Sequence, residues 1–247
     1  MLSGMDTQLY IVTGASRGMG AAIAAQLAAA GHRVLGLSRR VDPAATFEQW
    51  PIDLADAVAA AQRLEAWLVG QRGADFHSAT LINNAALLPR AAPLQAVPGD
   101  ELVAALRVGL EAPMLLTAAF LRATASWKGP RRVLNISSGL GRRAMAGQAA
   151  YCAVKAGMDH FSRCVALDEA RLPDGAKIVS LAPGVIDTDM QVQLRTSDLG
   201  TFPDGAGFRQ LHASGQLTTP EAAAARVLAW LARPDFGANP VADVREG

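Results

Sequence analysis

The chain has 247 residues, of which 51% are hydrophobic and 18% are charged, a composition that suits one or two globular domains and not a disordered chain. Its 23 basic and 22 acidic residues leave a formal net charge of +1, and the sequence has no run of like charge that could follow a phosphate backbone or an anionic membrane. We therefore expect no nucleic-acid partner and no membrane partner.

Short apolar, β-rich runs alternate with helical patterns along the whole chain. The runs that predict strands are Leu9–Thr13, Arg33–Ser38, Gln49–Ile52, Thr80–Asn83, Arg132–Ser137, Lys177–Ala182 and Val241–Val244. The segments that predict helices are Met19–Ala30, Ala55–Val69, Asp100–Thr124, Ala149–Ala170 and Pro220–Ala232. This alternation is typical of a mainly parallel sheet covered on both faces, so we expect an α/β, doubly wound fold of about seven strands.

Two connections depart from this alternation. The one over residues 39–48 is short for a crossover and contains Pro43, so at most a turn or two of helix fits there. Residues 191–219 contain four glycines and a proline without a clear period, which predicts a loop with at most one short helix. We expect residues 190–219 to form a substrate lid within a single domain that spans residues 1–247.

Cysteines and histidines give no sign of a metal site. The only cysteines are Cys152 and Cys164, without the second pair that a zinc site would need, and the four histidines are scattered singly. The N-terminal segment lacks a basic stretch followed by an apolar one, and no later segment approaches the roughly 18 uninterrupted apolar residues of a membrane span. We expect a cytoplasmic protein with no metal ion.

The first predicted strand leads into a glycine-rich segment, residues 13–20 (TGASRGMG). Glycines permit a tight turn from strand to helix and a close approach of backbone to a pyrophosphate, and the following helix N-terminus offers free N–H groups. The segment predicts a dinucleotide site. By itself, it leaves open a glycine-rich turn without a ligand.

The spacing of Gly14, Gly18 and Gly20 is that of the TGxxxGxG motif, and in this the chain resembles the short-chain dehydrogenase/reductase family. Further motifs of that family follow in order: Asp53-Leu54, Asn83–Ala86, Asn135–Ser138, Tyr151–Lys155 and Pro183-Gly184. The resemblance implies a Rossmann-type fold, a nicotinamide cofactor and an oxidoreductase activity.

Arginines at two places predict NADP(H) as the cofactor. Ser38-Arg39-Arg40 ends the second predicted strand, where an acidic residue would bond the ribose 2′-hydroxyl of NAD and an arginine would bind the 2′-phosphate of NADP. We expect Ser38 and Arg39 as principal ligands, with Arg17 assisting. A solvated surface pair is the alternative for Arg39 and Arg40.

The resemblance also implies the other cofactor contacts. By this resemblance, Asp53 would bond the adenine ring and Asn84 would lie on the adenosine side of the cofactor. Ile186 and Thr188 match residues that hold the nicotinamide carboxamide in the family. As residues alone, Asp53 could cap the following helix and Asn84 could form a turn. The expected cofactor-binding residues are Gly14, Ser16, Arg17, Gly18, Met19, Gly20, Ser38, Arg39, Asp53, Asn84, Ala85, Tyr151, Lys155, Pro183, Gly184, Ile186 and Thr188.

Ser138, Tyr151 and Lys155 are the expected catalytic residues. Tyr151 and Lys155 are four residues apart in a helical pattern and so share one face, and Ser138 ends a strand at the edge where open α/β sheets bind ligands. Hydride arriving at a carbonyl carbon leaves an alkoxide that needs a proton. A phenol can donate this proton if a cation, here Lys155 with the nicotinamide, lowers its pKa from about 10. Ser138 would hydrogen-bond the same oxygen.

Two positions depart from the family pattern. Ala86 stands where the family usually has glycine, and Gly109 stands where many relatives carry an asparagine that supports a proton-relaying water. If Gly109 occupies that place, we expect its missing side chain to leave room for water beside Lys155.

Segments 182–191 and 215–221 resemble the bacterial benzil reductases, which are similar to sepiapterin reductases. That branch implies NADPH-dependent reduction of a small ketone or diketone, such as a benzil-like aryl carbonyl. Several large apolar residues could line the substrate pocket, although a core role is open for each. They are Leu140, Met145, Met190, Leu194, Phe202 and Phe208.

Two other functions stay open at this point. One is a non-catalytic NADP-binding sensor or scaffold, which only Gly109 favours, and the other is an alcohol dehydrogenase working in the oxidative direction. By analogy with relatives, helices 100–124 and 149–170 would pack against their copies in a homodimer or homotetramer.

Overall fold

The computed structural model describes residues 7–246 and contains a single sheet of seven parallel strands in the order β3-β2-β1-β4-β5-β6-β7. The strands are β1 (Leu9–Thr13), β2 (Arg33–Ser38), β3 (Glu48–Pro51), β4 (Ala79–Asn83), β5 (Arg131–Ile136), β6 (Lys177–Ala182) and β7 (Val241–Asp243). In the centre of the sheet, Ile11 of β1 lies between Leu35 of β2 and Leu81 of β4. The predicted doubly wound, Rossmann-type fold of one domain is confirmed.

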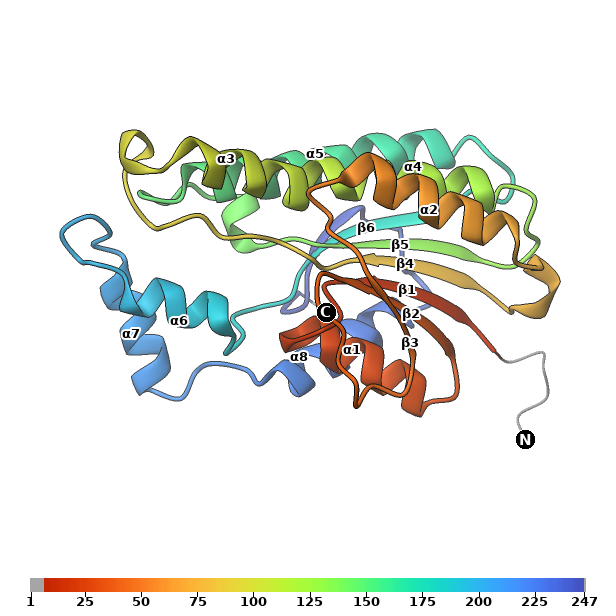
Figure 1. The fold of residues 1–247 in the computed structure, drawn as a ribbon, viewed down its shortest axis with the longest axis horizontal. Coiled ribbons are helices and arrows are strands. Elements are labelled where there is room, and N and C mark those ends of the chain that lie inside the picture. The colour runs from red at the N-terminus through yellow and green to blue at the C-terminus, as the bar shows by residue number, and fades with distance from the viewer. Residues whose placement is uncertain (1–6, 247) are drawn as a thin grey trace.

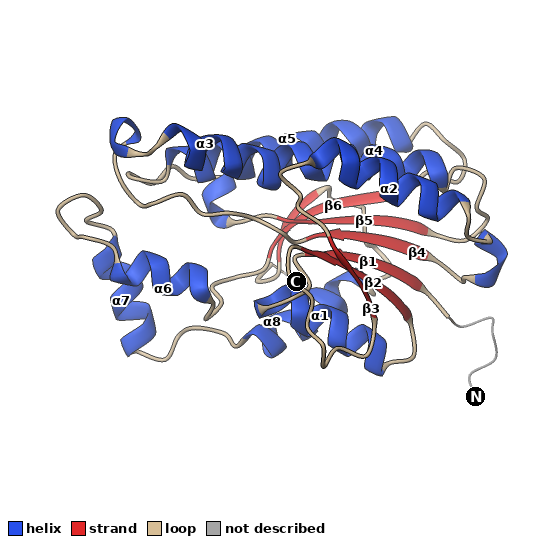
Figure 2. Ribbon diagram, in the orientation of Figure 1, coloured by secondary structure: helices blue, strands red, loops and turns tan. Residues whose placement is uncertain are grey.

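The helices are α1 (Gly18–Ala29), α2 (Ala57–Val69), α3 (Gly99–Leu106), α4 (Ala112–Ala123), α5 (Ala149–Glu169), α6 (Asp189–Thr196), α7 (Gly205–Ala213) and α8 (Pro220–Leu231). Figure 1 shows α2, α4 and α5 above one face of the sheet, with α3 at the end of that layer, and α1 and α8 below the other face. Figure 2 shows the same three layers, with α6 and α7 beyond the ends of the strands at the left.

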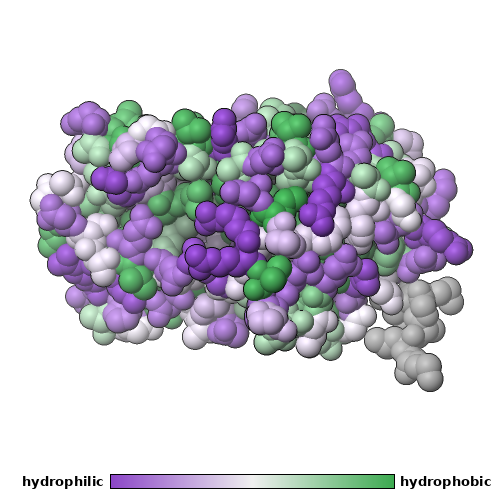
Figure 3. Space-filling model, viewed as in Figure 1, coloured by the Kyte–Doolittle hydropathy of each residue, from purple (hydrophilic) through white to green (hydrophobic). Residues whose placement is uncertain are grey.

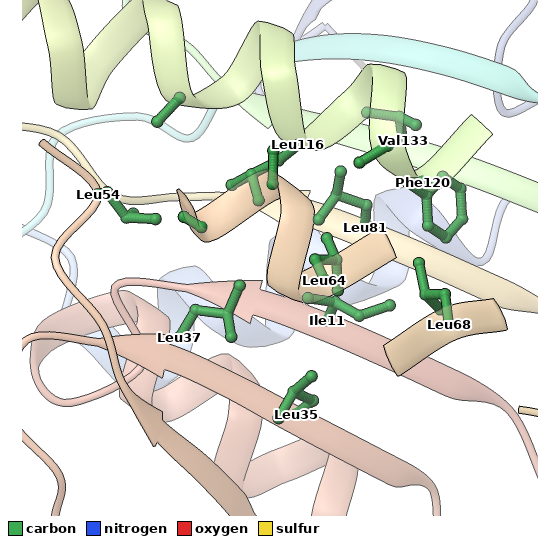
Figure 4. Close-up of a cluster of buried hydrophobic side chains, with 14 of the residues drawn as sticks. Ile11, Leu35, Leu37, Leu54, Leu64, Leu68, Leu81, Leu116, Phe120 and Val133 are labelled. Carbon is green, nitrogen blue, oxygen red and sulfur yellow. The ribbon is translucent and has the colours of Figure 1, made fainter. Parts of the chain in front are cut away.

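Strand β1 shows how the core is divided between the two faces. All five of its residues are buried, as expected for a central parallel strand covered on both sides. Because successive side chains alternate, Leu9 and Ile11 enter one apolar cluster and Tyr10 and Val12 enter the other. Figure 4 shows the first cluster, where Leu64 and Phe120 from α2 and α4 meet the side chains of the strands.

The long predicted helix over residues 100–124 is continuous but not uniform. A π-helical turn, Arg107–Glu111, separates α3 from α4. The combined stretch, Gly99–Ala123, is the one helix within residues 7–246 whose length and composition would allow it to cross a membrane. Its buried residues, such as Leu116 and Phe120, lie in the core cluster against the sheet, and the core helix of a globular protein passes the same test.

The predictions for the two irregular connections differ in outcome. Residues 39–47 contain no helix, as predicted. The prediction of at most one short helix in 191–219 is wrong, because this segment holds all of α7 and most of α6. The glycines that masked the pattern lie at the ends of α7 and in its first turn. There Gly205 packs against Leu199 and Phe202, so tertiary contacts stabilise a helix with weak local propensity.

Candidate active site

A cavity of about 850 Å³ lies where the strands end, within the usual range for small-molecule sites. It is lined by the residues that follow β1, β2, β4, β5 and β6, which is the carboxyl edge of the sheet. Every residue that the sequence analysis named as a catalytic or cofactor candidate lines this one cavity. Figure 3 shows apolar side chains within a hollow on this face, bordered by hydrophilic ones.

The glycine-rich turn has the conformation that its sequence predicted. Gly14 and Gly18 have φ angles of +69° and +56°, which side chains rarely adopt. A Cβ atom on Gly20 would lie 2.3 Å from both the Gly14 carbonyl oxygen and Asn84 Nδ2, so no larger residue fits there. The turn leads into the N-terminus of α1, which has no side-chain cap and whose first residues line the cavity, so the N–H groups that a helix leaves unpaired at its start lie beside the cavity.

Asn84 and Ala85 hold this turn in place. Asn84 Nδ2 donates a hydrogen bond to the Thr13 carbonyl oxygen (2.9 Å), and the backbone N–H groups of Asn84 and Ala85 donate to Thr13 Oγ1 (2.9 and 3.0 Å). Asn84 is therefore a brace between the ends of β1 and β4. Thr13, which sequence reasoning missed as a site residue, is the centre of this brace, and a threonine directly before the first glycine was the signal.

At the end of β2, Ser38 is 8% exposed, and its hydroxyl makes no hydrogen bond with the described residues. Arg39 and Arg40 follow it, are exposed, and line the cavity. Buried polar groups normally have partners, so the Ser38 hydroxyl is available to a ligand beside two guanidinium groups.

Asp53 also lines the cavity and is exposed, and among the described residues its carboxylate accepts a hydrogen bond only from its local neighbour Ala55 N (3.0 Å). The alternative role as a helix cap does not hold for Asp53. Helix α2 begins two residues later than expected, and Asp56 caps it by accepting from Ala59 N (3.3 Å). Asp53 is thus free to meet a ligand.

Ser138, Tyr151 and Lys155 come together at the other end of the cavity. Tyr151 and Lys155 are 8% and 2% exposed, and Lys155 Nζ lies 5.6 Å from the centre of the Tyr151 ring. Lys155 Nζ donates a hydrogen bond to the Ile136 carbonyl oxygen (2.7 Å). Ser138 Oγ accepts one from Leu140 N (3.2 Å).

Burial controls the protonation of this group. Burial raises the pKa of Tyr151 to about 12, although the Ser138 hydroxyl acts to lower it. Burial also lowers the pKa of Lys155 to about 8, against the attraction of Asp159. The expected lowering of the Tyr151 pKa by Lys155 is not found in the protein by itself, where desolvation of the phenolate is the largest effect and raises this pKa.

Pro183, Gly184, Ile186 and Thr188 follow β6 along the cavity wall. Gly184 has a φ of +85°, and Ile186 pairs with Thr218 in an isolated bridge. Thr188 precedes α6 and lies close to the glycine-rich turn. A Cβ atom added to Gly18 would lie 3.6 Å from Thr188 Cγ2. An ion pair between Arg17 and Asp189 also joins the glycine-rich turn to α6.

The apolar candidates divide into two groups. Leu140, Met190, Leu194 and Phe208 line the cavity. Phe202 is fully buried, and with Met145 it belongs to a small core cluster under α6 and α7, so the pocket role expected for these two is not supported.

Arg143 and Arg245 also line the cavity, and sequence reasoning missed both. Neither lies in a family motif, so only the folded chain places them there. Within residues 7–246, no group of three or more His, Cys, Asp or Glu side chains is arranged to hold a metal ion.

Gly109 lies in the π-helical turn and is buried. A Cβ atom on it would lie 2.6 Å from Val154 Cγ1. The prediction that the missing side chain leaves room beside Lys155 is therefore wrong at the Cβ position. The residue before Lys155 on α5 fills that space.

Comparisons with known proteins agree on one family. The family model described as short chain dehydrogenase matches residues 8–199. A benzil reductase ((S)-benzoin forming) from Bacillus cereus is 34% identical over 245 residues, covering 96% of this chain and 98% of that protein. A protein of the same description from Bacillus subtilis (strain 168) is 35% identical over 226 residues, covering 91% of this chain and 93% of that one.

A solved structure is similar over nearly the whole chain. It is a metagenomic short-chain oxidoreductase in complex with NADP, with a TM-score of 0.70 and 25% identity, covering 98% of this chain and 96% of that chain.

Gly109→Ala should lower the free energy of unfolding by about 1–3 kcal/mol through its clash with Val154, less a gain in helix propensity of up to about 1 kcal/mol. Thermal unfolding measures this. Adding Val154→Ala to Gly109→Ala should recover part of the loss. The control is Gly207→Ala in α7, where an added Cβ meets nothing within 4 Å. A Gly109→Ala protein as stable as wild type would contradict the close packing.

Proposed function

The chain belongs to the short-chain dehydrogenase/reductase family of oxidoreductases, and from that premise we propose that it reduces a small ketone or diketone to the alcohol with NADPH. One observation carries the proposal. Ser138, Tyr151 and Lys155 line the same cavity as the glycine-rich turn and Arg39. Similarity to two benzil reductases supports an aryl diketone as the substrate class.

Two features of the cavity and one similar solved structure support NADP(H). The N-terminus of α1 has no side-chain cap and its first residues line the cavity, which suits a pyrophosphate because such helix ends bind phosphate groups. Ser38 offers a buried, unpartnered hydroxyl beside Arg39 and Arg40, which suits the 2′-phosphate because a guanidinium binds phosphate with two hydrogen bonds. The structural relative in complex with NADP supports the same choice.

The remaining cofactor contacts are proposed for residues that line the cavity: Gly14, Ser16, Arg17, Gly18 and Met19 for the phosphates, Asp53, Asn84 and Ala85 for the adenosine, and Pro183, Gly184, Ile186 and Thr188 for the nicotinamide.

In the proposed mechanism, the bound cofactor supplies a hydride to the carbonyl carbon. Tyr151 donates its phenolic proton to the carbonyl oxygen, and Ser138 donates a hydrogen bond that orients this oxygen. The raised pKa of Tyr151 keeps it protonated at neutral pH in the free protein, so the proton is present when the substrate arrives. Lys155 holds the ribose and provides positive charge beside the phenol as the proton leaves.

We further propose that α6 and α7 form the substrate lid, within residues 190–219. Leu194 of α6 and Phe208 of α7 face the cavity. The Arg17–Asp189 pair that ties α6 to the glycine-rich turn is about 70% exposed on both sides. Exposed ion pairs contribute only about 0–1 kcal/mol, so breaking this pair costs little when the lid opens.

NADPH oxidation in the presence of a panel of ketones and aryl diketones tests the proposed reaction. Steady turnover of at least one carbonyl supports it. Tight NADPH binding without turnover of any carbonyl would instead favour a cofactor-binding sensor or scaffold, and turnover confined to alcohols with NADP⁺ would favour the oxidative direction.

Tyr151→Phe should lower kcat by about 10²- to 10⁴-fold, the usual contribution of a general acid, because it removes the proton donor. NADPH affinity, measured by titration of the cofactor's fluorescence, should hardly change. Tyr10→Phe is the matched control, since this other tyrosine is bonded to Gln8 away from the cavity. Normal kcat in Tyr151→Phe would remove Tyr151 from its proposed role.

Arg39→Ala should weaken NADPH by roughly 10- to 100-fold, as expected for one charge-assisted contact, and should leave NADH nearly unaffected because NADH lacks the 2′-phosphate. Dissociation constants for both cofactors measure the effect. The control is Arg72→Ala, an exposed arginine with a side chain 84% exposed, outside the cavity lining. Equal losses for NADPH and NADH would show that Arg39 does not select the cofactor.

We also propose a homodimer or homotetramer formed through the outer faces of the layer of α3, α4 and α5. Val103, Leu106, Met114 and Leu167 expose large apolar side chains on these helices, and such side chains are often covered in oligomers. Light scattering should give two or four times the chain mass of 25.8 kDa. A monomer at micromolar concentration would contradict the proposal.

A further inference from the structure

A buried carboxylate lies directly behind the proposed catalytic residues. Asp159 is on α5, one helical turn after Lys155 and on the same face. It is 2% exposed. Asp159 Oδ1 accepts hydrogen bonds from Ser137 Oγ (2.5 Å) and Ser180 Oγ (2.7 Å). These serines lie just before Ser138 and on β6, so one oxygen joins α5 to two strand ends at the cavity.

The second carboxylate oxygen faces a cation. Arg142 Nε lies 3.3 Å from Asp159 Oδ2, in an ion pair without hydrogen-bond geometry. Arg142 also donates to the Ala242 carbonyl oxygen of β7 (2.8 Å), and its Nη1 is 3.9 Å from Asp243. The turn that carries Arg142 is pressed onto α5, since a Cβ on Gly141 would lie 3.0 Å from Asp159 Oδ2.

Stability alone does not account for a carboxylate at this position. Taking a charge out of water costs several kcal/mol, and buried ion pairs are often replaced by apolar residues without loss. Neighbouring core positions on α5, Val154 and Met158, are apolar. The position of Asp159 beside Lys155 is therefore better explained by its charge.

Lys155 has few other sources of negative charge. Its ammonium group bonds to a neutral carbonyl, that of Ile136. The charged and titratable groups around this part of the cavity are Tyr151 on α5, Arg142 and Arg143 after β5, and Asp243 and Arg245 of the β7 end. Asp243 is already bonded to Arg245. The attraction of Asp159 opposes the effect of burial on the pKa of Lys155.

We propose that Asp159 is a positioning residue of this active site, whose carboxylate fixes the strand ends beside Ser138 and whose negative charge favours the ammonium form of Lys155. The inference rests on the proposed function for its role in turnover. Its electrostatic part concerns the chain alone and can be measured without a substrate.

The chain has three lysines, Lys128, Lys155 and Lys177, so a protein labelled with ¹³C at the lysine ε-carbon gives three signals. Lys155→Met assigns the Lys155 signal. Lys128 and Lys177 are exposed and lie outside the cavity, so their signals are internal references that the substitutions should not move.

Asp159→Asn keeps the shape of the side chain and removes its charge. We expect the titration midpoint of Lys155 to fall by about one pH unit, as for the loss of a nearby opposite charge. The control Ser180→Ala removes one hydrogen bond of Asp159 and keeps its charge, so Lys155 should titrate as in wild type. A Lys155 midpoint unchanged in Asp159→Asn would reduce Asp159 to a structural link and overturn the proposal.

Arg142→Gln changes the charge around Asp159 in the opposite direction. This variant tests the proposal if Asp159→Asn does not fold. Removing the cation that partly neutralises Asp159 should raise the Lys155 midpoint. No change, or a fall, would overturn the proposal. The Arg142 side chain is 30% exposed, so this variant disturbs the core less.

The pH–rate profile connects the charge to turnover. In Asp159→Asn, the alkaline limb of kcat should move to lower pH by the same amount as the Lys155 midpoint, with Ser180→Ala again as control. If the Lys155 midpoint moves and the limb does not, Asp159 does not act on catalysis and the proposal fails. If wild type turns over no carbonyl, the proposed function fails, whereas the lysine titration still reports whether Asp159 acts on Lys155.

Discussion

The reversal of strand order between β1 and β4 is the constraint on which the rest of the structure depends. From β1 the chain leaves to α1 on one face of the sheet, and from β4 it leads to α3 and α4 on the other. Segments that leave neighbouring strands in opposite directions cannot cover the gap between them, so a crevice opens at the carboxyl edge. The bond from Asn84 to the Thr13 carbonyl oxygen holds the two strand ends at this point.

Burial of Tyr151 and Lys155 shifts their pKa values in opposite directions. Tyr151 is kept neutral, and Lys155 is pushed towards its neutral form. A phenol that retains its proton suits a donor, but an uncharged lysine would give no assistance to the departing proton. The carboxylate of Asp159, tied to Ser137, Ser180 and Arg142, lies where a buried negative charge favours the ammonium form. The same network joins α5, β5, β6 and β7, so charge and geometry are set together.

The two ends of the cavity differ in how firmly they are held. The catalytic end lies on the sheet and on α5, with buried partners throughout. The proposed lid, in contrast, is joined to the glycine-rich turn by the exposed Arg17–Asp189 pair, and its Leu194 and Phe202 pack against Ala91 of the segment after β4 in a small core cluster. This cluster is much smaller than the two clusters on the faces of the sheet, and segments with few buried apolar contacts open locally at lower cost. Substrate selection would therefore fall on a part of the chain that can rearrange.

Local sequence determined most of this protein. Alternating runs predicted the strands and the helices of the two layers to within two residues. Motif spacing, which reflects local backbone geometry, singled out Gly14, Ser138, Tyr151 and Lys155 as site candidates, and these residues line one cavity. Only the tertiary structure decided which side chains from distant parts of the sequence are in contact. Val154 fills the space at Gly109, Phe202 packs into a small core with Ala91 and Leu194, and Arg143 and Arg245 line the cavity. Asp159 gave no signal, because its partners come from strands and turns far apart in the chain, and such contacts depend on packing that no local pattern encodes.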